Sequence, residues 1–373
     1  MGGIRPANSA NKGSHKEKKI STGNVTSKKT TDKGQDKKPK KIHTEDKQKK
    51  NYNTDDELTI DTINKHFFEY ERNNTYNEIR RHFLYNEFNK IEKILQSFIE
   101  KYPKAKDNEY YYYMGVIHEN RGKYISALEN YKKAIDILPT YSRARNSLGS
   151  LYCKMHKYDK ALKNFLLAMK TNPYNPFIQY NIGSLYFKIG ELDKAIKYLK
   201  NSIKYKANFG SSFHKLANIM YQKKRFRDAI QYYQKAIEFN TVSHTTYYFI
   251  GLSYLNIKNI SSAINSLNQS LKLKNDFFEA ALEMGKIYHS YGEFKNAIRM
   301  YLWAETINAE HKNLQLWLSQ CYSEIGEYRA ALAILKKQIE QDPDNDKLKK
   351  HLQNLEKKIK VENFNDPDDY YKY

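Results

Sequence analysis

The sequence has few cysteines and no long hydrophobic run, and each shortage excludes a class of protein. Two cysteines, Cys153 and Cys321, cannot build a disulfide framework in 373 residues, which favours a reducing compartment. No stretch of about 18 consecutive apolar residues occurs, so we expect no transmembrane segment. The first residues, "MGGIRPANSANK", lack the apolar core of a signal peptide, so we predict a cytoplasmic protein.

Acidic residues are also in short supply, with 42 Asp and Glu against 64 Lys and Arg. The excess is concentrated in residues 1–50, which hold 15 basic and 5 acidic residues. Residues 1–55 also lack periodic apolar side chains, so we predict a disordered basic tail. Two interpretations of its lysines stay open. Residues 12–50 bind nucleic acid or an acidic membrane surface weakly and non-specifically, or the tail is merely solvated and lysine-rich through codon bias.

Amphipathic helices are expected after the tail, over residues 56–107. The apolar residues Ile60, Ile63 and Phe67 are three and four apart, which predicts one apolar helical face. A second run with helical spacing ends at Pro103 and contains Phe88, Ile91, Leu95 and Phe98.

A repeat of 34 residues then dominates the chain. A glycine recurs at this spacing or a multiple of it, at Gly115, Gly149, Gly183, Gly251 and Gly285. Twelve positions later an alanine recurs without exception, at Ala127, Ala161, Ala195, Ala229, Ala263, Ala297 and Ala331. A large residue follows four positions after each alanine, for example Phe165 after Ala161. Small residues allow two helices to approach closely and large ones fill the space between them, so each unit predicts an antiparallel helix pair.

Such a helix–turn–helix unit resembles the tetratricopeptide repeat. Seven units fit residues 108–345, and a degenerate one fits 72–105 within the N-terminal helices. The resemblance implies an all-α fold, a right-handed α-solenoid of antiparallel helix pairs. Residues 346–360 place leucines on one face and lysines on the other, which predicts a C-terminal cap helix. Residues 361–373 are expected to be a loose acidic tail.

Motifs of catalysis are missing from the sequence. It contains no glycine-rich phosphate loop, no paired-cysteine motif and no metal-binding histidine pair, so we predict no enzyme activity, no cofactor and no metal. His118 occupies a position that Tyr152 and Tyr186 hold in other units, which favours a core role. Cys153 is interpreted as a structural thiol.

In the family that the chain resembles, the first helix of each unit lines a concave groove. That places Tyr112, Asn146, Tyr180, His214 and Tyr248 in one row, 34 residues apart. Neighbouring positions add hydroxyl, amide and aromatic groups, which suit a peptide or protein partner. The predicted binding residues are Tyr112, Asn146, Phe177, Tyr180, Ser184, Phe187, His214, Asn218, Tyr221 and Tyr248. Because the chain contains 33 tyrosines, composition alone is the alternative explanation for several of them.

Relatives that bind acidic chaperone tails use a Lys/Asn/Asn/Lys/Arg clamp. The corresponding positions here hold Tyr112, Val116, Asn146, Phe177 and Asn181, so we predict no such clamp. The leading hypothesis is therefore a non-catalytic scaffold or adaptor that binds a protein segment in its groove. The alternative is a protein tethered to an anionic surface by its basic tail, and self-association is also open.

Overall fold

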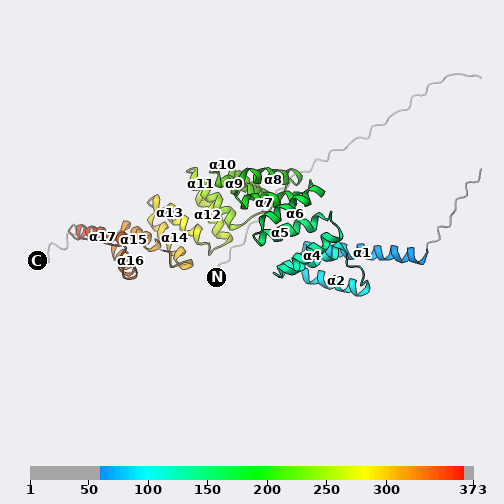
Figure 1. Ribbon diagram of the computed structural model, residues 1–373. Helices are drawn as coiled ribbons and strands as arrows, with labels where there is room; N and C mark the ends of the chain where they lie inside the picture. Colours follow the sequence, from blue (N-terminus) through cyan, green and yellow to red (C-terminus); the bar gives the residue numbers. More distant parts are fainter. Residues whose placement is uncertain (1–58, 312, 365–373) are drawn as a thin grey trace, which may run out of the picture. The chain divides into compact units, whose positions relative to one another are not determined.

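The computed structural model describes residues 59–311 and 313–364, and within these ranges it contains helices and turns without a strand (Figure 1). The helices are α1 (Ile60–Leu84), α2 (Phe88–Lys101), α3 (Asn108–Asn120), α4 (Tyr124–Ile137), α5 (Ser142–Lys154), α6 (Tyr158–Thr171), α7 (Pro176–Lys188), α8 (Leu192–Tyr205), α9 (Gly210–Gln222), α10 (Phe226–Glu238), α11 (His244–Asn256), α12 (Ile260–Leu273), α13 (Phe278–Ser290), α14 (Phe294–Ile307), α15 (Leu314–Glu324), α16 (Tyr328–Gln341) and α17 (Asp346–Phe364). The predicted all-α repeat fold is confirmed.

Each unit is a pair of helices joined by a short turn, and successive pairs pack on one another. The first and second helices of units 108–345 are α3 and α4, α5 and α6, and so on to α15 and α16. Turns this short force the two helices of a pair to run antiparallel. The pattern of small and large residues therefore produces the predicted helix pairs.

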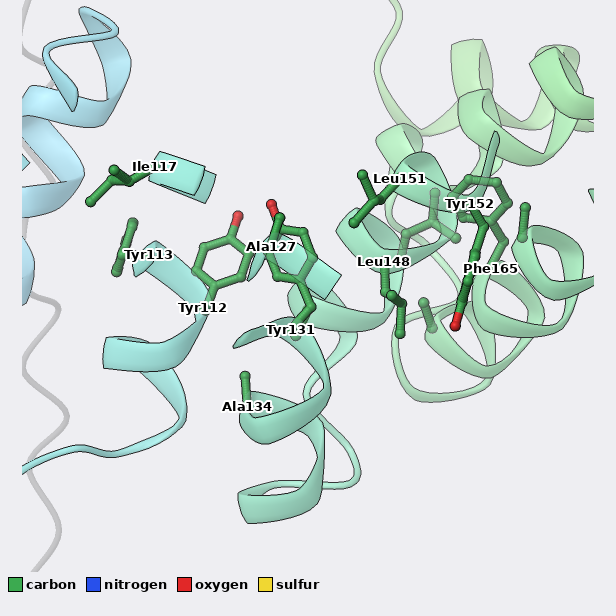
Figure 2. Packing of buried hydrophobic residues seen from close by; sticks show 14 of the residues in the cluster. Tyr112, Tyr113, Ile117, Ala127, Tyr131, Ala134, Leu148, Leu151, Tyr152 and Phe165 are labelled. Atoms are coloured by element: carbon green, nitrogen blue, oxygen red, sulfur yellow. The ribbon is translucent and has the colours of Figure 1, made fainter. Parts of the chain in front are cut away.

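The recurrent glycine is the point of closest approach within a pair. A Cβ atom at Gly115 would lie 2.6 Å from the ring of Tyr131, and one at Gly183 would lie 2.8 Å from Cγ of Leu199. The recurrent alanines, including Ala127 and Ala195, are completely buried. Figure 2 shows Tyr131 next to Ala127 in the core of its unit. The repeating residues thus form the core and leave the other positions free to vary.

The first helix pair, α1 and α2, lacks the small residues that bring the helices of the other pairs close together. The degenerate unit carries Ile79, Ile91 and Phe98 where the others carry glycine, alanine and a small residue, and all three are buried. The backbones of α1 and α2 accordingly make few close contacts, in contrast to the other pairs. Longer side chains connect α1 to its neighbours instead. Arg72 and Tyr76 donate hydrogen bonds to Asp107, which precedes α3.

The apolar face expected at the start of α1 forms but is not buried. The predicted helix is present, and its apolar residues Ile60, Ile63 and Phe67 are all exposed. Every later first helix has a preceding pair stacked on it, whereas α1 has no such pair among the described residues. The physical reason is therefore that no described helix pair lies against this face of α1.

The last helix, α17, packs on α16 through Leu348 and Leu355, which confirms the predicted cap helix. It ends at Phe364, four residues beyond the predicted end. The predicted tail over residues 1–55 lies outside the described residues, as does most of the predicted tail over 361–373. The division of the chain into the ranges 1–55, 56–107, 108–345, 346–360 and 361–373 stays a prediction.

Candidate partner-binding surface

The first helices of successive units contact one another directly, from α3 to α5, α7, α9 and α11. No two successive second helices are in comparable contact among the described residues. The first helices are therefore closer together, and side chains on adjacent first helices meet across a short gap. This arrangement makes them one continuous surface.

The predicted row on these helices is only partly on the surface. Tyr112 is 7% exposed and packs against the ring of Tyr131 (Figure 2). It also contacts the ring of Tyr141, so its assignment to the binding surface is wrong. Its unit uses tyrosines, at positions 112, 113, 131 and 141, to fill its core. The other members of the row are half-buried: Asn146, Tyr180, His214 and Tyr248.

A second row, one residue further along each helix, was missed by sequence reasoning. Its members recur every 34 residues and are Asn181, Lys215, Phe249, Glu283 and Trp317. Several of them contact the preceding first helix and so bridge neighbouring units. The signal was present in the sequence, since the same spacing defines both rows, but only the packing shows that this position points toward the preceding unit.

Amide and hydroxyl groups form the bridge between α5 and α7. Asn181 Nδ2 donates a hydrogen bond to Asn146 Oδ1 at 2.9 Å. Ser184, one turn further along α7, is half-buried, and its Oγ is buried without a hydrogen-bond partner in the described structure. The half-buried amides of Asn146 and Asn181 make this end of the surface polar.

A lysine and an aromatic ring form the bridge between α7 and α9. Lys215 Nζ lies 5.2 Å from the centre of the Phe187 ring, a cation–π contact. Burial and the nearby Lys188 lower the pKa of Lys215. Neither lysine forms an ion pair with a described carboxylate within 4.0 Å. Lys215 is partly removed from water and lies near the exposed Lys188, so these two like charges favour an anion beside them.

Aromatic side chains form the bridge between α9 and α11. The Tyr221 and Phe249 rings are 5.1 Å apart, and Tyr248 lies 5.4 Å from Phe249. Burial, together with Glu283 of α13, raises the pKa of Tyr221 and raises that of Tyr248 to about 12. Glu283 itself pairs with Lys286 at 2.8 Å. This part of the surface is apolar with neutral phenols.

The remaining predicted residues take two different roles. Phe177 is 50% exposed, and its ring lies edge-on to the ring of Phe209, with 5.1 Å between the ring centres. The ring of Tyr180 also packs against Phe209. His214 and Asn218 face inward, because His214 packs edge-on against Tyr233 and Asn218 accepts a hydrogen bond from its hydroxyl. Burial lowers the pKa of His214, with Lys215 contributing.

Charge on the central first helices has one sign. The helices α5, α7, α9 and α11 contain no aspartate or glutamate, although they include Arg143, Arg145, Lys154, Lys188 and Lys215. Lys154 is neutralised by Glu119 of α3 at 2.8 Å. Acidic residues appear on the flanking helices α3 and α13. The centre of the surface is therefore basic and its two ends carry carboxylates.

Other kinds of site find no support in the part of the chain that the structure describes. Residues 59–311 and 313–364 contain no group of three or more His, Cys, Asp or Glu side chains placed to hold a metal ion. In the same ranges, no helix combines the length and apolar character needed to cross a bilayer. Both cysteines are free thiols.

Comparisons with known proteins agree with the helix-pair architecture. Three family models, each described as tetratricopeptide repeat, match residues 84–241, 244–277 and 290–355. No curated protein matches the chain.

Two similar solved structures are repeat proteins of this kind. One is the C-terminal part of a TPR repeat-containing protein from Cytophaga hutchinsonii, 20% identical, with a TM-score of 0.55 over 64% of this chain and 98% of that one. The other is a crystal structure of the APC/C hetero-tetramer Cut9–Hcn1, 17% identical, with a TM-score of 0.53 over 65% of this chain. The match spans 48% of the chain in that complex. At such identities the likeness shows the fold alone.

Proposed function

The chain belongs to the tetratricopeptide repeat family, and from this premise we propose that it is a non-catalytic scaffold or adaptor that holds a segment of a protein partner. The segment lies along the first helices from α5 to α11. The observation that carries the proposal is the second row, because its half-buried members Asn181, Lys215 and Phe249 bridge neighbouring first helices while the repeating core residues are buried. Aromatic rings supply contact area and polar groups supply orientation.

The positive charge at the centre of the first-helix surface indicates which chemical groups the partner segment carries. A segment with carboxylate or phosphate groups would place them beside Lys188 and Lys215, which pair with no carboxylate among the described residues. Apolar side chains next to these groups would cover Tyr221, Tyr248 and Phe249. Ionic pairing beside a partly buried lysine is stronger than at an open surface. The proposed partner segment is thus anionic toward α7 and apolar toward α11.

This proposal differs from binding of a chaperone tail. That interaction depends on basic residues at positions where this chain has Tyr112, Phe177 and Asn181. The prediction that the clamp is absent therefore stands beside the proposal of an anionic segment. Cytoplasmic localisation stays a prediction, supported by two free thiols, and the alternative role of residues 12–50 lies outside the described residues.

Affinity purification of the full chain, followed by quantitative mass spectrometry, tests the proposal. We expect Lys215→Glu to deplete the partner at least tenfold, because it replaces the attractive charge with a repulsive one. Phe249→Ala should deplete the same partner by removing apolar contact area. The control is Lys132→Glu, an equal charge change at an exposed position of the second helix α4, which should leave recovery unchanged.

Peptide binding in solution then identifies which groups of the partner segment the surface recognises. Peptides in which its acidic residues are replaced by the corresponding amides, or its phosphate is removed, should bind more weakly than the native peptide. An acidic chaperone-tail peptide serves as a specificity control and should not bind. Equal recovery of the partner by the wild type, Lys215→Glu and the triple variant Tyr180→Ala, Asn218→Ala, Tyr248→Ala would show that binding occurs elsewhere.

A further inference from the structure

The exposed face of α1 carries a regular pattern that the rest of the repeat array does not use. Between Ile63 and Leu84, every residue at alternating spacings of four and three is exposed. We call these residues the α1 seam: Ile63, Phe67, Tyr70, Asn74, Asn77, Arg81 and Leu84. The opposite face is packed through Tyr76 and Ile79, which are fully buried. Spacing of this kind is that of one helix in a two-stranded coiled coil.

The α1 seam is too apolar for a surface that only faces water. Its apolar members are 49% exposed at Ile63, 54% at Phe67, 66% at Tyr70 and 77% at Leu84. At the other end of the array, α17 covers the last unit and turns lysines outward. Terminal repeats require a polar outer face of this sort for solubility. Among residues 59–311 and 313–364 no helix covers the α1 seam in this way, so this exposed face is suited to a partner.

Helix length and local shape also favour a helical partner. With 25 residues, α1 is about 37 Å long, while the other first helices have 11 to 13 residues. The α1 seam borders a crevice of about 770 Å³ between α1 and α2, lined by Tyr70, Asn74, Arg81, Ile94 and Phe98 among others. The crevice follows from the large residues that separate this pair. It provides a concave edge against which a second helix can lie.

We infer that the α1 seam is a homodimer interface, in which α1 of a second copy of this chain lies parallel and in register. The argument is the mixed composition of the seam, with apolar residues at Ile63, Phe67 and Tyr70 followed by Asn74 and Asn77. A wholly apolar partner would leave the Asn74 amide unpaired at the contact, which is costly, whereas Asn77 Oδ1 already accepts a hydrogen bond from Arg80 at 2.8 Å. A second copy in register matches apolar with apolar and amide with amide. Asn at such a position specifies register and pairing.

Two features limit the strength of this dimer. Arg81 would face its own copy, so the closest contact is expected in the N-terminal part of the seam, with Arg81 extending toward water. A single helix pair also buries less than the roughly 800 Å² per partner of a stable interface. The expected dimer is therefore weak and reversible.

Sedimentation equilibrium of the full chain tests the inference. We expect a monomer–dimer equilibrium, and at least a tenfold weaker dimer for Phe67→Glu. The control is Tyr291→Glu, which places the same charge at another exposed aromatic residue, 60% exposed, and should not change the equilibrium. Melting curves of both variants exclude loss of fold, because Phe67 contributes little buried surface.

Cross-linking tests the register. In a Cys153→Ser background, Asn74→Cys should form an intermolecular disulfide, since equivalent residues face each other in a parallel pair. Lys65→Cys, exposed but off the seam, should not. A wild type that stays monomeric at several hundred micromolar, a dimer unaffected by Phe67→Glu, or equal cross-linking at both positions would overturn the inference. None of these outcomes bears on the first-helix surface, whose test is partner recovery.

Discussion

Gly149 of α5 faces Phe165 of α6 so closely that a Cβ atom on the glycine would lie 2.6 Å from the phenylalanine ring. The two residues are 16 positions apart, and the same relation joins Gly115 to Tyr131 and Gly251 to Leu267. Residue Phe165 is 1% exposed, so its ring has no free space into which to move. The contact sets the distance between the helices of a pair.

Replacing Gly149 with alanine should destabilise the chain by about 1–3 kcal/mol, because a tightly packed core resists one added methyl group. The higher helix propensity of alanine opposes this by about 1 kcal/mol. Urea denaturation measures the difference. A double-mutant cycle with Phe165→Ala is the control, since removing the ring should make Gly149→Ala far less harmful. Additive effects of the two substitutions would contradict the proposed clash.

The turns between the two helices of a unit lead to a prediction of increased stability. Gly190 and Lys258 occupy equivalent turn positions, with φ of 85° and 62°. The left-handed conformation costs a lysine more than a glycine, although glycine loses more entropy on folding. We therefore expect Lys258→Gly to stabilise the chain by about 0.5–1 kcal/mol in thermal or urea unfolding. The control Lys258→Ala removes the same side chain but keeps the strained φ, so it should give no gain.

The repeat register could be predicted from sequence because its constraint is local and recurs. Gly149 and Ala161 must be small wherever two helices touch, and each unit repeats the requirement. The binding surface was harder to predict from the sequence, because the position of a residue in the repeat does not determine whether its side chain is buried. Tyr112 aligns with half-buried residues of other units, yet the tyrosine-rich core around Tyr131 encloses it.

Contacts between units could not be predicted from the sequence. Lys215 has no local feature that distinguishes it from other lysines, and its proximity to Phe187 depends on how α9 stacks on α7. The exposure of Phe67 has the same origin, since no earlier pair among the described residues covers α1. Helical spacing predicts that a face exists, whereas stacking determines what lies against it.

Asp107 ties the long first helix to the regular repeats. Its carboxylate caps α3 by accepting a hydrogen bond from the Tyr110 backbone, and it also accepts from Tyr76 and Arg72 at 2.7 Å each. Asp107→Ala should cost about 2–3 kcal/mol, because it removes a helix cap and leaves a partly buried guanidinium without its partner.

Hydrogen exchange locates the effect of Asp107→Ala. In a repeat protein each unit contacts only its neighbours, so faster exchange is expected in α1 and α2 and not in α13 or α14. Tyr76→Phe removes one of the hydrogen bonds and should produce a smaller change in the same helices. Uniformly faster exchange along the whole chain would contradict a local role.

Cys321 provides a probe of the other end of the array. Its side chain is completely buried in α15, and burial, with Glu324 contributing, raises the pKa of its thiol from an ordinary value of 9.0 to about 12. The folded state therefore holds this proton more tightly than the unfolded state. The stability that depends on the neutral thiol is complete below pH 9 and declines as the pH rises from about 9 to 12.

The reactivity of the thiols checks this directly. At pH 8, the half-buried Cys153 should react with a disulfide reagent much faster than Cys321, because reaction requires an accessible thiolate. In a Cys153→Ser variant, labelling of Cys321 should occur only as α15 unfolds, and its rate should rise with urea. In the unfolded chain the two thiols should react alike. Rapid labelling of Cys321 in the absence of denaturant would contradict this expectation, because it would show that the thiol is accessible in the folded seventh unit.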